Sequence, residues 1–88
     1  MINIKYLITY DLVSPGQDYE ALYQAIKNVS TSYRHGMQNT WFIESTQAVT
    51  NIRDNISPVL DTGDKLFVLP INGWASFNMG DIATWLNG

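Results

Sequence analysis

The run IKYLITYD, residues 4–11, combines aliphatic, aromatic and β-branched residues, which is the composition of a buried β-strand. Apolar side chains occur at both even- and odd-numbered positions of this run, so they lie on both faces of the strand. We therefore expect a central strand over residues 3–11 that is covered on at least one side. Ser14-Pro15-Gly16 follows directly and is typical of a turn. Asp11 therefore stands where a central strand leaves its sheet, a position from which small α+β proteins often present chemistry.

The composition predicts one globular domain over residues 1–88, with 45% apolar residues. The chain has no cysteine, which excludes disulfides and cysteine-ligated metals. No apolar run approaches the roughly 20 residues of a membrane helix, and the first residues lack a signal-peptide pattern, so we expect a cytoplasmic protein without membrane contact. The net charge of −3, with five basic residues, disfavours tight nonspecific binding to nucleic acid.

Two segments have the apolar periodicity of amphipathic helices. The first segment, residues 17–29, carries one stripe formed by Tyr19, Leu22, Ile26 and Val29. The second segment, residues 47–60, carries a stripe formed by Val49, Ile52, Ile56 and Val59 or Leu60. Ser45-Thr46 offers an N-cap for the second helix. Pro58 has no backbone N–H to donate, so we expect it to bend or loosen the last turn.

Three further segments predict strands. Residues 33–35 form the first, with Gly36 as a bulge or bend and Asn39 in a turn. Residues 40–44 form the second, rich in β-branched and aromatic side chains. Residues 65–71 form the third, and its Pro70 indicates an edge strand or a strand end. A short extended piece over residues 74–77 and a helix over residues 79–86 complete the chain.

The element order is β-α-β-β-α-β followed by a helical tail, which is the order of a ferredoxin-like α+β domain. Two helices would then cover one face of an antiparallel sheet. The other face keeps apolar side chains that need a cover. One cover is the C-terminal tail with Trp74, Phe77 and Trp85, and the other is a second subunit. A homodimer that packs sheet on sheet is the simplest arrangement of the second kind.

Several stretches resemble a known family. Tyr10-Asp11-Leu12 resembles the tyrosine-aspartate signature of the small CRISPR-associated adaptation subunit, as do residues 38–44 and 65–71 in their order along the chain. The closer resemblance is to the SinR-like proteins, small relatives found outside CRISPR loci. It is carried by residues 7–12 and 15–19, with Thr40-Trp41, Ile52-Arg53 and Trp74-Ala75-Ser76.

This resemblance implies a ferredoxin-like fold and a dimer. Some relatives are metal-dependent nucleases, and related VapD-like toxins cleave RNA, whereas others have no demonstrated catalysis. The chain departs from the adaptation subunits in two respects. It is acidic where they are usually basic, and a Trp-rich segment with a helix replaces their last strand, which pairs with the neighbouring subunit.

Asp11 is the candidate ligand for Mg²⁺ or Mn²⁺, shared with Asp11 of a second subunit, because these cations prefer oxygen ligands. The alternative is that its carboxylate caps the turn that follows. Tyr10, Arg34 and His35 are candidates to assist catalysis. His35 would act as a general base or would position a phosphate together with Arg34. The alternative for His35 is a solvated side chain at a strand end.

Three classes of function fit these residues. The first is a noncatalytic or regulatory relative of the adaptation subunit that acts through protein contacts, as the acidic charge favours. The second is a metal-dependent nuclease for RNA or DNA centred on Asp11. The third is a small inhibitor, encoded by a phage or mobile element, that binds a host defence protein.

Overall fold

The computed structural model describes residues 2–13 and 19–88, so the turn predicted at Ser14-Pro15-Gly16 lies outside the described residues. The elements follow in the order β1 (Ile4–Asp11), α1 (Tyr19–Asn28), β2 (Ser32–Met37), β3 (Thr40–Ser45), α2 (Val49–Ile56), β4 (Lys65–Pro70) and α3 (Ile82–Asn87). A single turn of 3₁₀ helix, η1 (Ser57–Val59), extends α2. The predicted βαββαβ order with a helical tail is confirmed.

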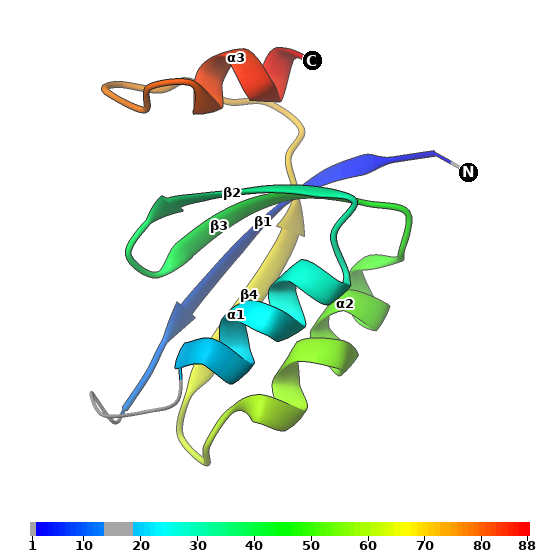
Figure 1. Cartoon of the computed structure of the whole chain (residues 1–88), viewed down its shortest axis with the longest axis vertical. Helices are drawn as coiled ribbons and strands as arrows, with labels where there is room; N and C mark the ends of the chain where they lie inside the picture. The colour runs from blue at the N-terminus through cyan, green and yellow to red at the C-terminus, as the bar shows by residue number, and fades with distance from the viewer. Residues whose placement is uncertain (1, 14–18) are drawn as a thin grey trace.

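The four strands form one antiparallel sheet in the order β2-β3-β1-β4. Helices α1 and α2 lie against one face of this sheet, and α3 lies on the other side (Figure 1). This is the ferredoxin-like arrangement. We call the side that α1 and α2 cover the helix face, and the opposite side the open face. The tail, residues 71–88, crosses the open face.

The main core fills the space between the helix face and the two helices. It exists because alternate residues of β1 point to one side while α1 and α2 each turn an apolar stripe toward them. Ile8, Ile26 and Ile52 are fully buried at its centre. The other buried residues of this core are Tyr6, Tyr10, Leu22, Val29, Trp41, Ile43 and Ile56.

The start of α2 differs from the prediction. Ala48 occupies the N-cap position, without a side-chain hydrogen bond. The Ser45 hydroxyl instead donates to the Val29 carbonyl at 2.6 Å and accepts from the Gln47 amide at 3.1 Å. Ser45 is buried, so its hydroxyl satisfies these backbone groups in the interior rather than at the helix end. The predicted cap at Ser45-Thr46 is therefore wrong.

The loosening expected from Pro58 is confirmed. The α-helix ends at Ile56, and Pro58 lies in the following 3₁₀ turn. The pyrrolidine nitrogen cannot donate a hydrogen bond, so the regular α-helical ladder stops before it. The helix is accordingly shorter than the predicted residues 47–60.

Gly36 is a bulge in β2, as the sequence predicts. The pairing of β2 with β3 shifts register between His35 and Met37. A Cβ atom added at Gly36 would lie 2.6 Å from Cε2 of Phe42 and 2.8 Å from Cδ1 of Ile82. Only a glycine leaves room there for β3 and α3 to approach the bulged backbone.

The C-terminal helix is shorter than predicted and begins at Ile82 instead of residue 79. Asn78 and Gly80 have φ angles of 58° and 62°, in the left-handed region, which interrupts a right-handed helix. Residues 71–81 form neither helix nor strand. Ile82 and Leu86 of α3 pack against Phe42 and form a small second core on the open face.

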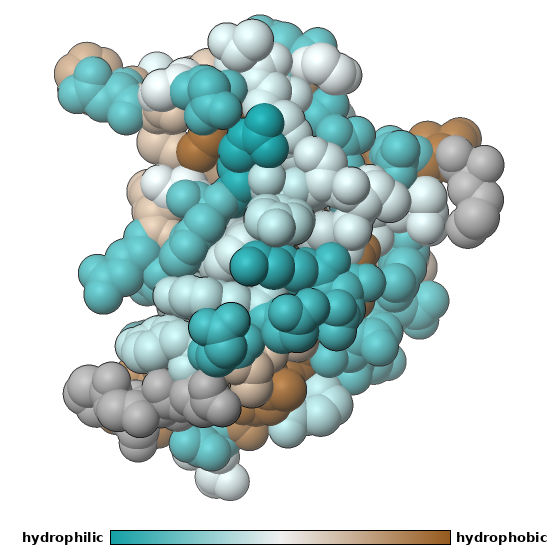
Figure 2. All heavy atoms as spheres, viewed as in Figure 1, coloured by the Kyte–Doolittle hydropathy of each residue, from teal (hydrophilic) through white to brown (hydrophobic). Residues whose placement is uncertain are grey.

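Pro70 is the last residue of β4, and β4 lies at an edge of the sheet, so both parts of the prediction for Pro70 are confirmed. The tail is then tied back to β1, because the Ile71 amide donates to the Lys5 carbonyl at 2.8 Å. Hydrophilic side chains cover most of the face seen in Figure 2. Across residues 2–13 and 19–88, no helix is both long and apolar enough to cross a membrane.

Candidate functional site

Asp11 is the exposed last residue of β1. Side chains alternate along a strand, so Asp11 projects toward the open face while Tyr10 projects into the main core. Lys65 is its register partner on the neighbouring strand β4. Thr9, Asn39 and Phe67 lie beside this pair around a shallow depression at the end of the strand. The structure thus leaves the Asp11 carboxylate accessible and next to a cation.

Tyr10 is buried and its hydroxyl is engaged on both sides. It accepts a hydrogen bond from the Trp41 indole N–H at 3.2 Å and donates one to the Gln38 carbonyl at 3.4 Å. Burial raises the pKa of the Tyr10 phenol, and the indole hydrogen bond opposes this effect only in part. Tyr10 therefore remains a neutral phenol that joins β1, β3 and the turn at Gln38.

His35 reaches the same carbonyl from β2. Its Nε2 lies 3.1 Å from the Gln38 carbonyl oxygen, which requires a proton on Nε2 because a carbonyl oxygen can only accept. The imidazole stacks on Trp41 with ring centroids 4.2 Å apart, and it lies edge-to-face with the Tyr23 ring, with centroids 5.1 Å apart. Tyr10 and His35 therefore meet at Gln38, within a group of aromatic rings on the helix face.

Arg34 lies on the open face, away from His35. Its Nε donates to Asp81 at 3.2 Å, and the guanidinium lies over the Trp85 ring at 5.6 Å. Arg34 also donates to the Tyr33 carbonyl at 2.8 Å. These contacts direct the guanidinium toward the C-terminal tail.

The structure thus separates the four predicted site residues. Tyr10 and His35 share the helix face, whereas Asp11 and Arg34 share the open face. On the open face, the strand register places Arg34 of β2 opposite Phe42 of β3, and Phe42 opposite Leu7 of β1. Leu7 lies four residues before Asp11 on β1. Within one chain, Arg34 and Asp11 therefore stand in different rows of the sheet and do not converge on one substrate atom.

Asp11 belongs to no cluster of metal-ligating side chains among the described residues. Among residues 2–13 and 19–88, no three side chains of the types His, Asp and Glu gather closely enough to hold a metal ion. A metal bound there would take its other ligands from a second copy, from water or from a substrate phosphate. The metal site shared across a two-fold axis stays a prediction.

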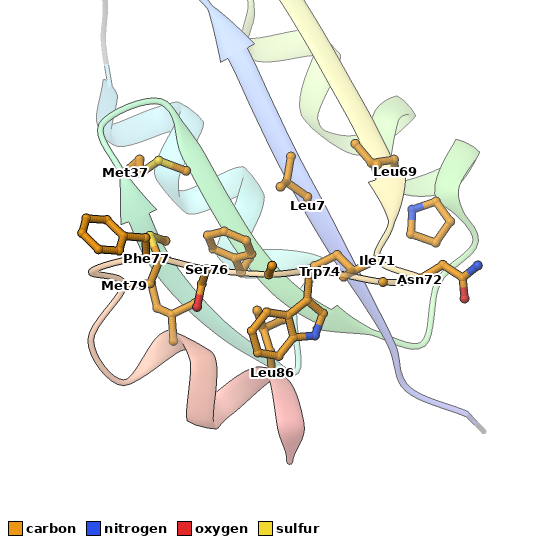
Figure 3. A pocket seen from close by; sticks show the side chains of 15 residues that line it. Leu7, Met37, Leu69, Ile71, Asn72, Trp74, Ser76, Phe77, Met79 and Leu86 are labelled. Atoms are coloured by element: carbon orange, nitrogen blue, oxygen red, sulfur yellow. The ribbon is translucent and has the colours of Figure 1, made fainter.

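The open face carries a feature that involves none of the four candidate site residues, a pocket of about 360 Å³ between the sheet and the tail (Figure 3). Fifteen residues line it, among them Leu7, Phe42 and Leu69 from the sheet, Trp74 and Phe77 from the tail, and Leu86 from α3. None of these fifteen described residues is charged.

Two tail residues remain exposed at this pocket. Trp74 is 40% exposed and Phe77 is 85% exposed. In Figure 3 the Phe77 ring projects outward next to Met37 and Met79. The concentration of aromatic residues after Gly73 was the signal in the sequence, and it predicted that the tail covers the sheet. The tail covers the open face in part and leaves an apolar rim.

Comparison with known proteins adds no relative to this description. No family model, no curated protein and no solved structure matches the chain. The resemblance to the SinR-like proteins therefore stays a prediction, and function is inferred from the geometry of the open face and of the Asp11 strand end.

Proposed function

We propose that this chain is a protein-interaction module of regulatory type that binds its partner through the open face. The observation that carries the proposal is the uncharged apolar pocket with Trp74 and Phe77 exposed at its edge. Aromatic side chains are enriched at protein interfaces, and their burial gives up little conformational entropy for a large contact area. A small domain gains from covering such a surface.

The distribution of charge supports a protein partner over a nucleic acid. The net charge is −3, and three of the five basic residues, Lys5, Arg34 and Lys65, belong to the strands. Two of these three already engage the tail: Lys5 donates to Gly88 O at 3.2 Å, and Arg34 pairs with Asp81. Binding to a phosphate backbone would need a basic stripe on one face.

A capture experiment with matched variants tests this proposal. The purified chain is used as bait in a lysate of the cells that encode it, beside Trp74→Glu on the open face and Thr50→Glu on the exposed side of α2. We expect one partner to be retained by the wild type and by Thr50→Glu and to be lost from Trp74→Glu. Retention by Trp74→Glu, or capture of nothing by the wild type, would refute the proposal. A host defence protein as the partner would support the inhibitor hypothesis.

A metal-dependent nuclease is the second candidate, favoured by the exposed Asp11 carboxylate at a strand end with Lys65 directly opposite. A divalent metal on Asp11 would activate water, and the Lys65 ammonium would attract a phosphate. Cleavage of labelled RNA and DNA with Mg²⁺ or Mn²⁺ tests it, with Asp54→Asn as the control for Asp11→Asn. Cleavage lost only in Asp11→Asn would establish a nuclease. Equal activity in both variants would exclude Asp11 as its metal ligand.

A further inference from the structure

The open face holds a cavity and a projecting side chain of the same chemistry next to each other. The cavity is the uncharged pocket of about 360 Å³, and the projection is Phe77, a phenyl ring 85% exposed at its rim. In Figure 3 this ring points outward and does not fill the pocket that it borders. A surface that carries both a projecting apolar ring and an apolar pocket is complementary to an identical surface on a second copy.

We propose that the occupant of this pocket is Phe77 of a second copy of the chain. Two copies that face each other about a two-fold axis would each insert Phe77 into the pocket of the other. Such an interface uses the same patch on both subunits and closes as a dimer instead of growing into a filament. This inference rests on the proposed function, because it names the partner of the same open face.

The size of the pocket fits this occupant. A cavity of about 150 Å³ lined by aliphatic and aromatic side chains holds one benzene molecule. The pocket here, at about 360 Å³, accepts a phenyl ring and leaves space for one further side chain of the second copy. Residues 71–77 of the tail form much of the wall of this pocket.

The charges on this face permit two identical surfaces to meet. Each copy carries a net charge of −3, so an interface with exposed carboxylates at its centre would repel a second copy. The fifteen described lining residues carry no charge, and the nearby Asp81 is paired with Arg34 of its own chain at 3.2 Å. The contact at the pocket itself therefore brings no like charges together.

The required contact extends beyond Phe77. A standard interface removes roughly 800 Å² of surface from each partner, which is about one seventh of the 5490 Å² that this chain exposes. A phenyl ring alone supplies only part of that area. The exposed Met37 and Trp74, together with Leu69 on the edge strand, lie around the same pocket and extend the apolar contact.

Sedimentation equilibrium with two phenylalanine variants tests the proposal. Phe67 is the matched control, because it is also an exposed phenylalanine, 63% accessible, but lies outside the pocket. We expect the wild type to dimerise and Phe77→Ala to raise the dissociation constant of the dimer roughly 30-fold or more, whereas Phe67→Ala changes it less than about threefold. Equal effects of the two variants would overturn the role of Phe77. Circular dichroism verifies that both variants are folded.

A photo-crosslinker identifies what Phe77 touches. The chain is made with benzoylphenylalanine at position 77, mixed with the ¹⁵N-labelled wild type, and irradiated. We expect crosslinks from the light position 77 to heavy peptides that contain Met37 or Leu69. Crosslinks confined to the light chain, or a wild type that stays monomeric up to about 1 mM, would overturn the second copy as occupant. The proposed function would still be supported in that case if the wild type captures a different protein and Trp74→Glu does not.

Discussion

The imidazole ring of His35 lies flat against the indole ring of Trp41, with centroids 4.2 Å apart and planes inclined by 11°. The two residues are direct partners across β2 and β3. The stack shields one side of Trp41, whose indole N–H donates to the buried Tyr10 hydroxyl. His35 thus has a structural role on the helix face that does not depend on catalysis.

Removal of the imidazole ring is expected to destabilise the fold. His35→Ala should lower the free energy of unfolding by about 1 kcal/mol, because a stacked aromatic pair contributes about that much beyond its buried area. His35→Phe keeps a ring at the position and should retain most of this stability. Urea denaturation of the three proteins measures the difference. Equal losses in both variants would instead assign the effect to the contact between His35 Nε2 and the Gln38 carbonyl.

The buried Tyr10 phenol predicts a loss of stability at alkaline pH. Burial raises the pKa of Tyr10 in the folded chain, so the unfolded chain releases this proton first as the pH rises. The protonated Tyr10 phenol therefore contributes fully to the free energy of unfolding below about pH 10, the pKa of a free tyrosine. This contribution is lost as the pH rises through the pKa of Tyr10 in the folded chain.

Tyr10→Phe should therefore flatten the dependence of the free energy of unfolding on pH above about pH 10. Denaturant titrations at a series of alkaline pH values measure the slope. Tyr33→Phe, which changes an exposed tyrosine in the same way, is the matched control. Equal slopes for the wild type and Tyr10→Phe would contradict the assignment.

The bulge at Gly36 predicts a large difference between two glycine substitutions. Gly36→Ala places a methyl group 2.6 Å from a ring carbon of Phe42 and should cost about 1–3 kcal/mol through overpacking. Gly73→Ala meets no atom within 4 Å and should change the stability by less than about 1 kcal/mol. Thermal unfolding of both variants tests this contrast. A Gly36→Ala protein as stable as Gly73→Ala would show that β3 and α3 yield easily.

The packing of α3 predicts a local opening of the tail. Leu86 is 8% exposed and belongs to the small core on the open face. Leu86→Ala should cost about 2–3 kcal/mol through the lost contacts and the cavity left behind. Hydrogen exchange should accelerate in residues 82–87, while the amides of β1 keep their protection, because the main core is separate. Uniform acceleration throughout the sheet would contradict an independent tail.

The sequence predicted the elements wherever a local pattern determines them. The strand pattern of residues 4–11 and the apolar stripes of α1 and α2 depend only on neighbours along the chain. The spacing of their apolar residues was therefore sufficient to predict these elements. Pro70 and Gly36 were also interpreted correctly, because proline and glycine restrict or free the backbone at their own position.

The remaining features depend on contacts between distant segments. Ser45 resembles a helix cap in sequence, yet its hydroxyl donates to Val29, 16 residues away. The adjacency of Arg34 and His35 in the sequence suggests a shared role, but adjacent residues of a strand point to opposite faces. Asp81, the partner of Arg34, is 47 residues distant. The pocket likewise exists only because the tail returns across the sheet.

The position of β1 at the centre of the sheet has a consequence for folding during translation. β1 is synthesised before both of its neighbours in the sheet, because these are β3 and β4, and β4 ends at residue 70. Its pairing therefore closes long loops, which slows folding. Residues 4–11 therefore lack one of their two partner strands until residues 65–70 have been synthesised. In this interval the unpaired edge makes the nascent chain prone to aggregation.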